Sequence, residues 1–96
     1  MKYKNLGQTG LKISELCFGT MSFGVEADEK TSAQMFAACR EQGINIFDCA
    51  DLYAHGRAEE ILGQLIKSIR EEVIVTSKVY FPTGPDINAM GANRRH

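Results

Sequence analysis

The chain has 96 residues, of which 44% are hydrophobic and 24% are charged, and its formal net charge is −1. This length holds one small domain, and the near-neutral charge provides no basic surface of the kind that binds nucleic acid. No apolar stretch approaches the roughly 20 residues of a membrane-spanning helix, and residues 1–4 lack the apolar core of a signal peptide. We therefore expect one folded cytoplasmic domain over residues 1–96, with neither nucleic acid nor a membrane as a partner.

The first predicted elements are a hairpin and a short strand. Residues 3–6 and 11–14 flank the turn Gly-Gln-Thr-Gly, whose residue types favour tight turns. Residues 16–20 form a brief apolar strand in which Gly19 marks the exit. The sequence then predicts a loop over residues 21–27.

The first predicted helix covers residues 29–42. Asp28 is a good N-cap for it, and Gly43 is a natural stop because glycine readily adopts the left-handed backbone that ends helices. Helical spacing favours one buried face, with Phe36 to one side of it. The residues of this predicted face are Met35, Ala38, Cys39 and Gln42.

Two more strands and a second helix follow. Residues 44–47 and 73–77 are apolar runs typical of buried strands, and residues 58–70 carry an apolar stripe at helical spacing between them. The stripe consists of Ile61, Leu62, Leu65, Ile66 and Ile69. Residues 79–96 contain two prolines and two glycines, which predict an exposed loop.

The three apolar strands begin near residues 16, 44 and 73, so the strand–helix unit repeats about every 28 residues. This period predicts an α/β fold with parallel strands. A closed (β/α)8 barrel needs roughly 200 residues or more. We therefore expect an N-terminal hairpin plus the first three strands and two helices of a TIM barrel, incomplete in this chain.

Three side chains stand at the ends of the later strands. Asp48 directly follows one strand, Lys78 directly follows the next, and Tyr53 lies on the loop that leaves the first of these strands. In parallel α/β folds the carboxyl edge of the sheet is where active sites are built. A lysine beside a tyrosine can lower the pKa of the phenol, and a carboxylate can hold the lysine in place. The three residues predict a proton-donating site.

The cysteines, Asp51 and His55 show no spacing typical of a metal site or a disulfide. The three cysteines are odd in number and irregularly spaced, so we expect reduced thiols packed as small apolar residues and no disulfide or zinc site. Asp51 and His55 share a loop, but their spacing matches no established pattern of metal ligands. We expect no metal, and we expect Asp51 to cap a local turn.

The run over residues 43–53 closely resembles the aldo-keto reductase family around its catalytic Asp and Tyr. Residues 5–14 and 18–21 are similar to the opening hairpin and first barrel strand of that family, and residues 76–78 to the strand that supplies its lysine. The resemblance implies a (β/α)8 barrel that binds NADPH and reduces aldehydes or ketones, with a small-molecule carbonyl compound as substrate.

The resemblance also implies a role for each matching residue. Tyr53 would be the general acid, and Lys78 would lower the pKa of the tyrosine from about 10 toward neutrality. Asp48 would pair with Lys78 and lie by the nicotinamide ribose. The remaining cofactor-binding positions, at the nicotinamide end, would be Gly19, Thr20 and Met21.

The family's catalytic histidine lies on the strand that would follow residue 96. His55 is no substitute, because it sits two residues after Tyr53 on the same loop. We therefore expect no turnover from this chain alone. Two alternatives to a reductase are a nucleotide-binding accessory or regulatory subunit of the same fold and a truncated product without function. Fold does not separate these readings, whereas the intact Asp48, Tyr53 and Lys78 favour the enzyme.

Overall fold

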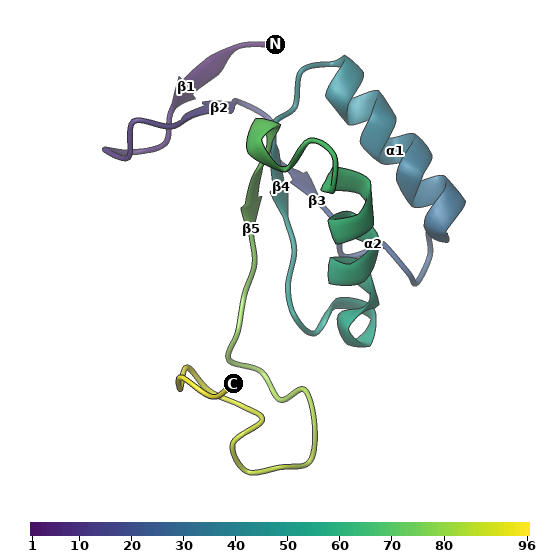
Figure 1. Cartoon of the computed structure of the whole chain (residues 1–96), viewed down its shortest axis with the longest axis vertical. Coiled ribbons are helices and arrows are strands. Elements are labelled where there is room, and N and C mark those ends of the chain that lie inside the picture. The colour runs from purple at the N-terminus through teal and green to yellow at the C-terminus, as the bar shows by residue number, and fades with distance from the viewer.

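The computed structural model describes all residues from Met1 to His96. An antiparallel hairpin is followed by three parallel strands with helices on one side of them, and the chain ends in a long irregular segment (Figure 1). The helices and strands in chain order are β1 (Tyr3–Asn5), β2 (Lys12–Ser14), β3 (Phe18–Gly19), α1 (Glu29–Glu41), β4 (Ile46–Asp48), the 3-10 turn η1 (Tyr53–Gly56), α2 (Arg57–Ile66), the 3-10 turn η2 (Arg70–Glu72) and β5 (Ile74–Thr76).

The predicted hairpin is confirmed and lies at the amino-terminal edge of the parallel sheet, opposite the C-terminal segment (Figure 1). Its anchor is the Asn45 side chain, which precedes β4. The Asn45 Nδ2 group donates to the Lys12 carbonyl at 3.0 Å, and Asn45 Oδ1 accepts from the Ser14 backbone N–H at 2.8 Å. One amide side chain thus satisfies two backbone groups of β2 and ties the hairpin to the sheet.

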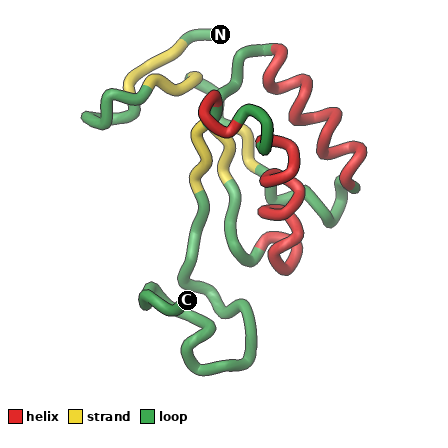
Figure 2. Tube along the Cα trace, in the orientation of Figure 1, coloured by secondary structure: helices red, strands yellow, loops and turns green.

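The sheet has the strand order β3-β4-β5 with both pairs parallel, as the repeat predicts. Phe18 lies opposite Phe47, Gly19 opposite Asp48, and Asp48 opposite Thr76. Figure 2 shows α1 and α2 on the same side of these strands. Three strands do not close a barrel, so the chain forms an open α/β unit. None of its helices combines the length and the apolar character that crossing a membrane would require.

Helix α1 begins where the sequence predicts and ends at Glu41, one residue before the predicted end. The Asp28 carboxylate accepts from the Thr31 backbone N–H at 2.7 Å, and Gly43 has a φ of 88° just past the end. The predicted buried face is partly wrong. In the structure the buried residues of α1 are Ser32, Phe36 and Cys39, whereas Ala38 and Gln42 are exposed.

The reason for this rotation of α1 is aromatic packing. The Phe36 ring lies 4.8 Å, centroid to centroid, from the ring of Phe47, which is fully buried in β4. Burying a phenylalanine contributes roughly 1.5–3 kcal/mol, which exceeds what the small Ala38 side chain can supply. The helix therefore turns its largest apolar side chain toward the sheet.

Helix α2 ends at Ile66, four residues before the predicted end. Ile69 has φ −129° and ψ 24°, outside the helical region, because the chain turns there to enter β5. Ile69 nevertheless packs against the core as a partly buried residue. The apolar stripe extends past the end of α2 because the following turn places Ile69, its last member, against the same core.

The core between the helices and the sheet determines where the functional residues point. Phe47 is 0% exposed, and its ring lies near the rings of Phe18 on β3 and Phe36 on α1. Side chains alternate along a strand, so the next residue, Asp48, faces away from the helices. Cys39 and Cys49 are buried free thiols, as expected, but Cys17, which precedes β3, is exposed.

Candidate active site

The structure brings Asp48, Tyr53 and Lys78 together at the carboxyl edge of the parallel sheet. The Lys78 Nζ atom donates to Asp48 Oδ2 at 2.6 Å, to the Cys49 carbonyl at 2.7 Å and to the Tyr53 hydroxyl at 3.2 Å. The same ammonium group lies 4.9 Å from the centroid of the Tyr53 ring, within cation–π range. One ammonium group thus bridges a carboxylate and a phenol.

Strand register explains this convergence. Asp48 and Thr76 are paired last residues of β4 and β5. The pairing continues beyond the strands, because Cys49 N–H donates to the Thr76 carbonyl at 2.8 Å and Asp51 N–H donates to the Lys78 carbonyl at 3.2 Å. Thr76 and Lys78 are two residues apart on extended backbone, so both side chains face Asp48.

Thr76 is a partner of the site that the sequence interpretation missed. Its hydroxyl donates to Asp48 Oδ1 at 2.5 Å, so both carboxylate oxygens have a donor. The available signal was the period-two spacing between Thr76 and Lys78. That signal required the register of β4 against β5, which no local pattern contains.

Hydrogen bonds keep the ion pair charged. The bonds from Lys78 and then Thr76 hold the pKa of the Asp48 carboxyl below its usual value, and the bond to Asp48 raises the pKa of Lys78. The side chains of Lys78 and Asp48 are 48% and 35% exposed, so water screens their attraction. Such a pair adds about 1 kcal/mol or less to folding stability, and its main effect is to orient the ammonium group.

The loop that carries Tyr53 has an unusual backbone. Ala54 and His55 have φ values of 52° and 55°, in the left-handed region, and Gly56 follows at 93°. A non-glycine residue in this conformation costs roughly 1–2 kcal/mol. Ala58, which is fully buried at the start of α2, anchors the far end of the loop. The sequence contains no local signal for the left-handed backbone at Ala54 and His55.

The predicted cofactor-binding residues of β3 and its exit take three different positions. Thr20 is fully buried, and both its N–H and its hydroxyl donate to the Asp48 carbonyl at 2.9 Å. Met21 is 67% exposed. Gly19 is exposed opposite Asp48, and a Cβ atom there would have no atom within 4 Å. Nothing within the chain requires glycine at that position, and the surface beside Asp48 is open there.

Asp51 does not cap a local turn as predicted. Its side chain makes no hydrogen bond to the loop backbone. Instead its Oδ2 atom lies 3.5 Å from Nε2 of His96, and its Oδ1 atom is buried without a hydrogen-bond partner. The local sequence favoured a turn cap because the partner is 45 positions away and belongs to the irregular C-terminal segment.

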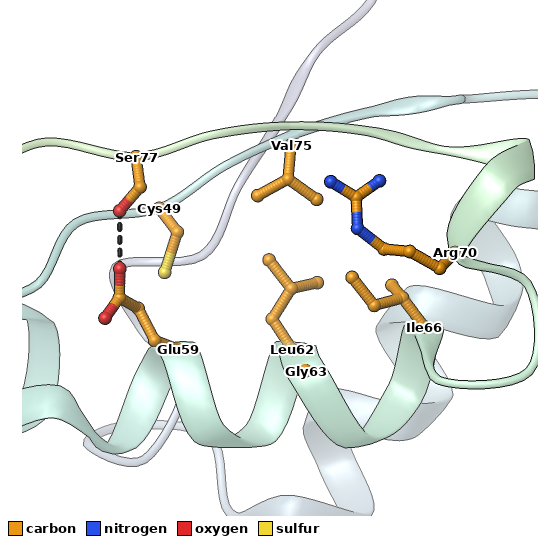
Figure 3. Close-up of a pocket in the computed structure, with 8 residues that line it drawn as sticks. All are labelled: Cys49, Glu59, Leu62, Gly63, Ile66, Arg70, Val75 and Ser77. Atoms are coloured by element: carbon orange, nitrogen blue, oxygen red, sulfur yellow. Dashed lines mark hydrogen bonds between the residues drawn. The ribbon is translucent and has the colours of Figure 1, made fainter.

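Two cavities lie beside this site and not within it. A cavity of about 220 Å³ between α2 and β5 is lined mainly by Leu62, Ile66 and Val75, and is closed at one end by the 2.6 Å hydrogen bond from Ser77 to Glu59 (Figure 3). None of Asp48, Tyr53 or Lys78 lines it. A second cavity of about 220 Å³ adjoins the Tyr53 loop; its lining residues are Asp51, Leu52, His55, Pro82 and Thr83.

Comparison with known proteins identifies the family of this chain. The sequence model described as "Aldo/keto reductase family" matches residues 15–96. This chain belongs to the aldo/keto reductase family. The holo form of aldo-keto reductase AKR11C1 from Bacillus halodurans has a similar structure, with a TM-score of 0.77 and 38% sequence identity, over 90% of this chain and 29% of that chain. The open α/β unit described above thus matches part of the TIM barrel of that family.

Two relatives extend the comparison. A protein of Arabidopsis thaliana named "Probable voltage-gated potassium channel subunit beta" is 43% identical over 100% of this chain and 30% of its own length. The "Uncharacterized oxidoreductase YrpG" of Bacillus subtilis is 42% identical over 85% of this chain and 27% of its own length. The chain therefore spans less than a third of the length of these relatives.

Proposed function

We propose that this aldo/keto reductase chain supplies the proton-donating part of an active site that reduces aldehydes or ketones to alcohols with NADPH. The observation that supports the proposal is the placement of the Lys78 ammonium 3.2 Å from the Tyr53 hydroxyl and 2.6 Å from the Asp48 carboxylate. An accessory role would not need a phenol held against a cation at the carboxyl edge of the sheet.

Each residue has a defined part in this chemistry. The Tyr53 hydroxyl gives its proton to the carbonyl oxygen of the substrate, as a general acid. Lys78 stabilises the negative charge left on the phenol oxygen. At 3.2 Å this attraction is worth about 1 kcal/mol at the dielectric constant of water and about 5 kcal/mol at an effective value near 20. Asp48, held by Thr76, orients Lys78.

The nicotinamide of NADPH, when bound, supplies the hydride. Gly19 and Met21 border the open surface beside Asp48 that would receive it. Thr20 supports this surface from below through its two hydrogen bonds to the Asp48 backbone. We infer that the isolated chain does not turn over, since it forms only three of the strands of a barrel.

The test uses a completed barrel. Residues 1–96 of this chain replace the matching 29% of the Bacillus halodurans reductase, and the remainder of that reductase supplies the other strands and helices. The assay follows NADPH oxidation with a nitrobenzaldehyde. Tyr53→Phe should lower kcat by about 10²- to 10⁴-fold, the usual contribution of a general acid, and should leave NADPH affinity intact. The matched control is Tyr80→Phe at a loop tyrosine that is 63% exposed. Equal activity of Tyr53→Phe and the parent barrel would refute the proposal.

A second candidate function is a nucleotide-binding accessory subunit. Two plant proteins, from Arabidopsis thaliana and Oryza sativa, carry the name "Probable voltage-gated potassium channel subunit beta" and are 43% and 42% identical over the whole chain. In that case Tyr53→Phe should change neither NADPH affinity nor binding to a partner protein. Slow or absent turnover in the parent barrel, together with unchanged cofactor binding, would favour this second function over the first.

A further inference from the structure

The loop that presents Tyr53 needs a restraint from outside itself. Ala54 and His55 are held in the left-handed region, which non-glycine residues rarely adopt without support from their surroundings. The backbone hydrogen bonds within the loop are local: Tyr53 N–H reaches the Ala50 carbonyl at a long 3.3 Å, His55 N–H reaches the Leu52 carbonyl at 3.1 Å, and Arg57 N–H donates to the Tyr53 and Ala54 carbonyls. These bonds join residues 50–57 to one another and do not tie the loop to other segments.

The C-terminal segment contacts this loop through the pair of His96 and Asp51. His96 has a side chain only 5% exposed, and its Nε2 atom faces Oδ2 of Asp51 at 3.5 Å. Asp51 is bound from the other direction as well, because its backbone N–H donates to the Lys78 carbonyl. Asp51 is therefore the residue at which the Tyr53 loop, the end of β5 and the C-terminal segment meet.

The orientation of His96 is itself built into the segment. Asn93 Oδ1 accepts from the backbone N–H of His96 at 2.8 Å and of Arg95 at 3.0 Å, while Asn93 Nδ2 donates to the Met90 carbonyl at 2.7 Å. This capping arrangement directs the imidazole inward. Both His96 Nε2 and Asp51 Oδ1 are buried without a hydrogen-bond partner, and buried polar atoms of this kind are uncommon.

We infer that His96 is a positioning residue for Tyr53. A small movement closes the 3.5 Å gap, so that the imidazole Nε2–H donates to Oδ2 of the Asp51 carboxylate and the buried Nε2 atom of His96 gains a hydrogen-bond partner. This bond fixes the loop that begins at Asp51 and keeps the phenol of Tyr53 beside Lys78. The inference rests on the proposed function for its catalytic meaning, whereas the physical coupling between His96 and the loop stands independently of turnover.

The test measures hydrogen exchange by NMR in the full chain and requires no substrate. In His96→Ala the His55 amide, which reports on loop closure, should exchange about five- to tenfold faster, as expected for the loss of one hydrogen bond. The Cys49 amide, bonded to Thr76 in the core, should be unchanged. His96→Gln places an amide N–H near the position of Nε2 and should restore most of the protection. The matched control is Arg94→Ala, at an exposed neighbour.

Equal exchange of the His55 amide in the wild type and in His96→Ala would overturn the inference. An equal acceleration at His55 and Cys49 would also overturn it, because it would mean that His96 acts on the whole fold. Asp51→Ala combined with His96→Ala should add little to either single change, because both remove the same contact. If the exchange result holds while Tyr53→Phe leaves carbonyl reduction intact, the positioning stands and the proposed reductase function fails.

Discussion

Replacing Lys78 with methionine separates the catalytic from the structural value of the ammonium group. Methionine retains an unbranched side chain of similar reach but removes the charge and three contacts, at 2.6 Å to Asp48, 2.7 Å to Cys49 and 3.2 Å to Tyr53. Because the Lys78 side chain is 48% exposed, the lost ion pair should reduce the free energy of unfolding by only about 1 kcal/mol. For a domain of this size that corresponds to a fall in Tm of about 4–8 °C.

The expected effect on catalysis is larger. The charge that develops on the Tyr53 oxygen loses an attraction of about 1 to 5 kcal/mol across 3.2 Å, which corresponds to roughly tenfold to several thousandfold in rate. The substrate gains or loses little in its ground state, so the loss should appear in kcat more than in KM. The loss of folding stability is smaller than the loss of transition-state stabilisation. In folding, the Lys78 ammonium exchanges its contacts with water for contacts within the protein, whereas in catalysis it stabilises the charged phenol relative to the neutral phenol.

The assay is NADPH oxidation by the completed barrel, accompanied by urea unfolding of the same variant. Lys67→Met is the matched control, since Lys67 is an exposed lysine just past α2 that takes part in no ion pair. A Lys78→Met barrel that unfolds normally and keeps its kcat within about twofold would refute the electrostatic reasoning, because even full water screening predicts about tenfold.

Three further predictions concern stability. The pKa of Asp48 is lowered in the folded chain, so its contribution to folding stability is fully present above the unfolded pKa of about 3.9 and is lost as pH falls through the folded pKa. The pKa of Lys78 is raised, so its contribution is fully present below the unfolded pKa of about 10.4 and is lost as pH rises through the folded pKa. The difference in free energy of unfolding between wild type and Asp48→Asn should therefore be constant near neutral pH and shrink at both extremes; a flat difference across the whole range would contradict this. Asn45→Ala should cost about 1–3 kcal/mol and speed exchange of the Ser14 amide, because Ser14 is 2% exposed and would keep an unpaired N–H, whereas Asn45→Asp should retain that one bond. Phe47→Ala should cost about 3–5 kcal/mol in denaturant unfolding, a large part of the 5–15 kcal/mol typical of a domain, with Phe47→Leu as the milder comparison.

Local chemistry was enough to predict the order and type of the elements. Asp28 and Gly43 delimit α1 because a carboxylate cap and a left-handed glycine act within one turn of the chain. The placement of Asp48 and Lys78 at one edge also followed from the sequence, because consecutive parallel strands end on the same side of their sheet. Residue spacing could not reveal which face of α1 is buried or that α2 ends before Ile69, since packing against Phe47 and the turn into β5 decide both.

The tertiary structure alone decided the working details of the site. The hydrogen bonds to Asp48 from Thr76 and Lys78 span 28 and 30 residues, and they exist because β4 and β5 pair in one particular register. The approach of His96 to Asp51 joins segments 45 positions apart in the sequence. Residue types set what each group can do chemically, but distances of a few ångströms between groups depend on how the whole chain packs, because no local interaction restrains them.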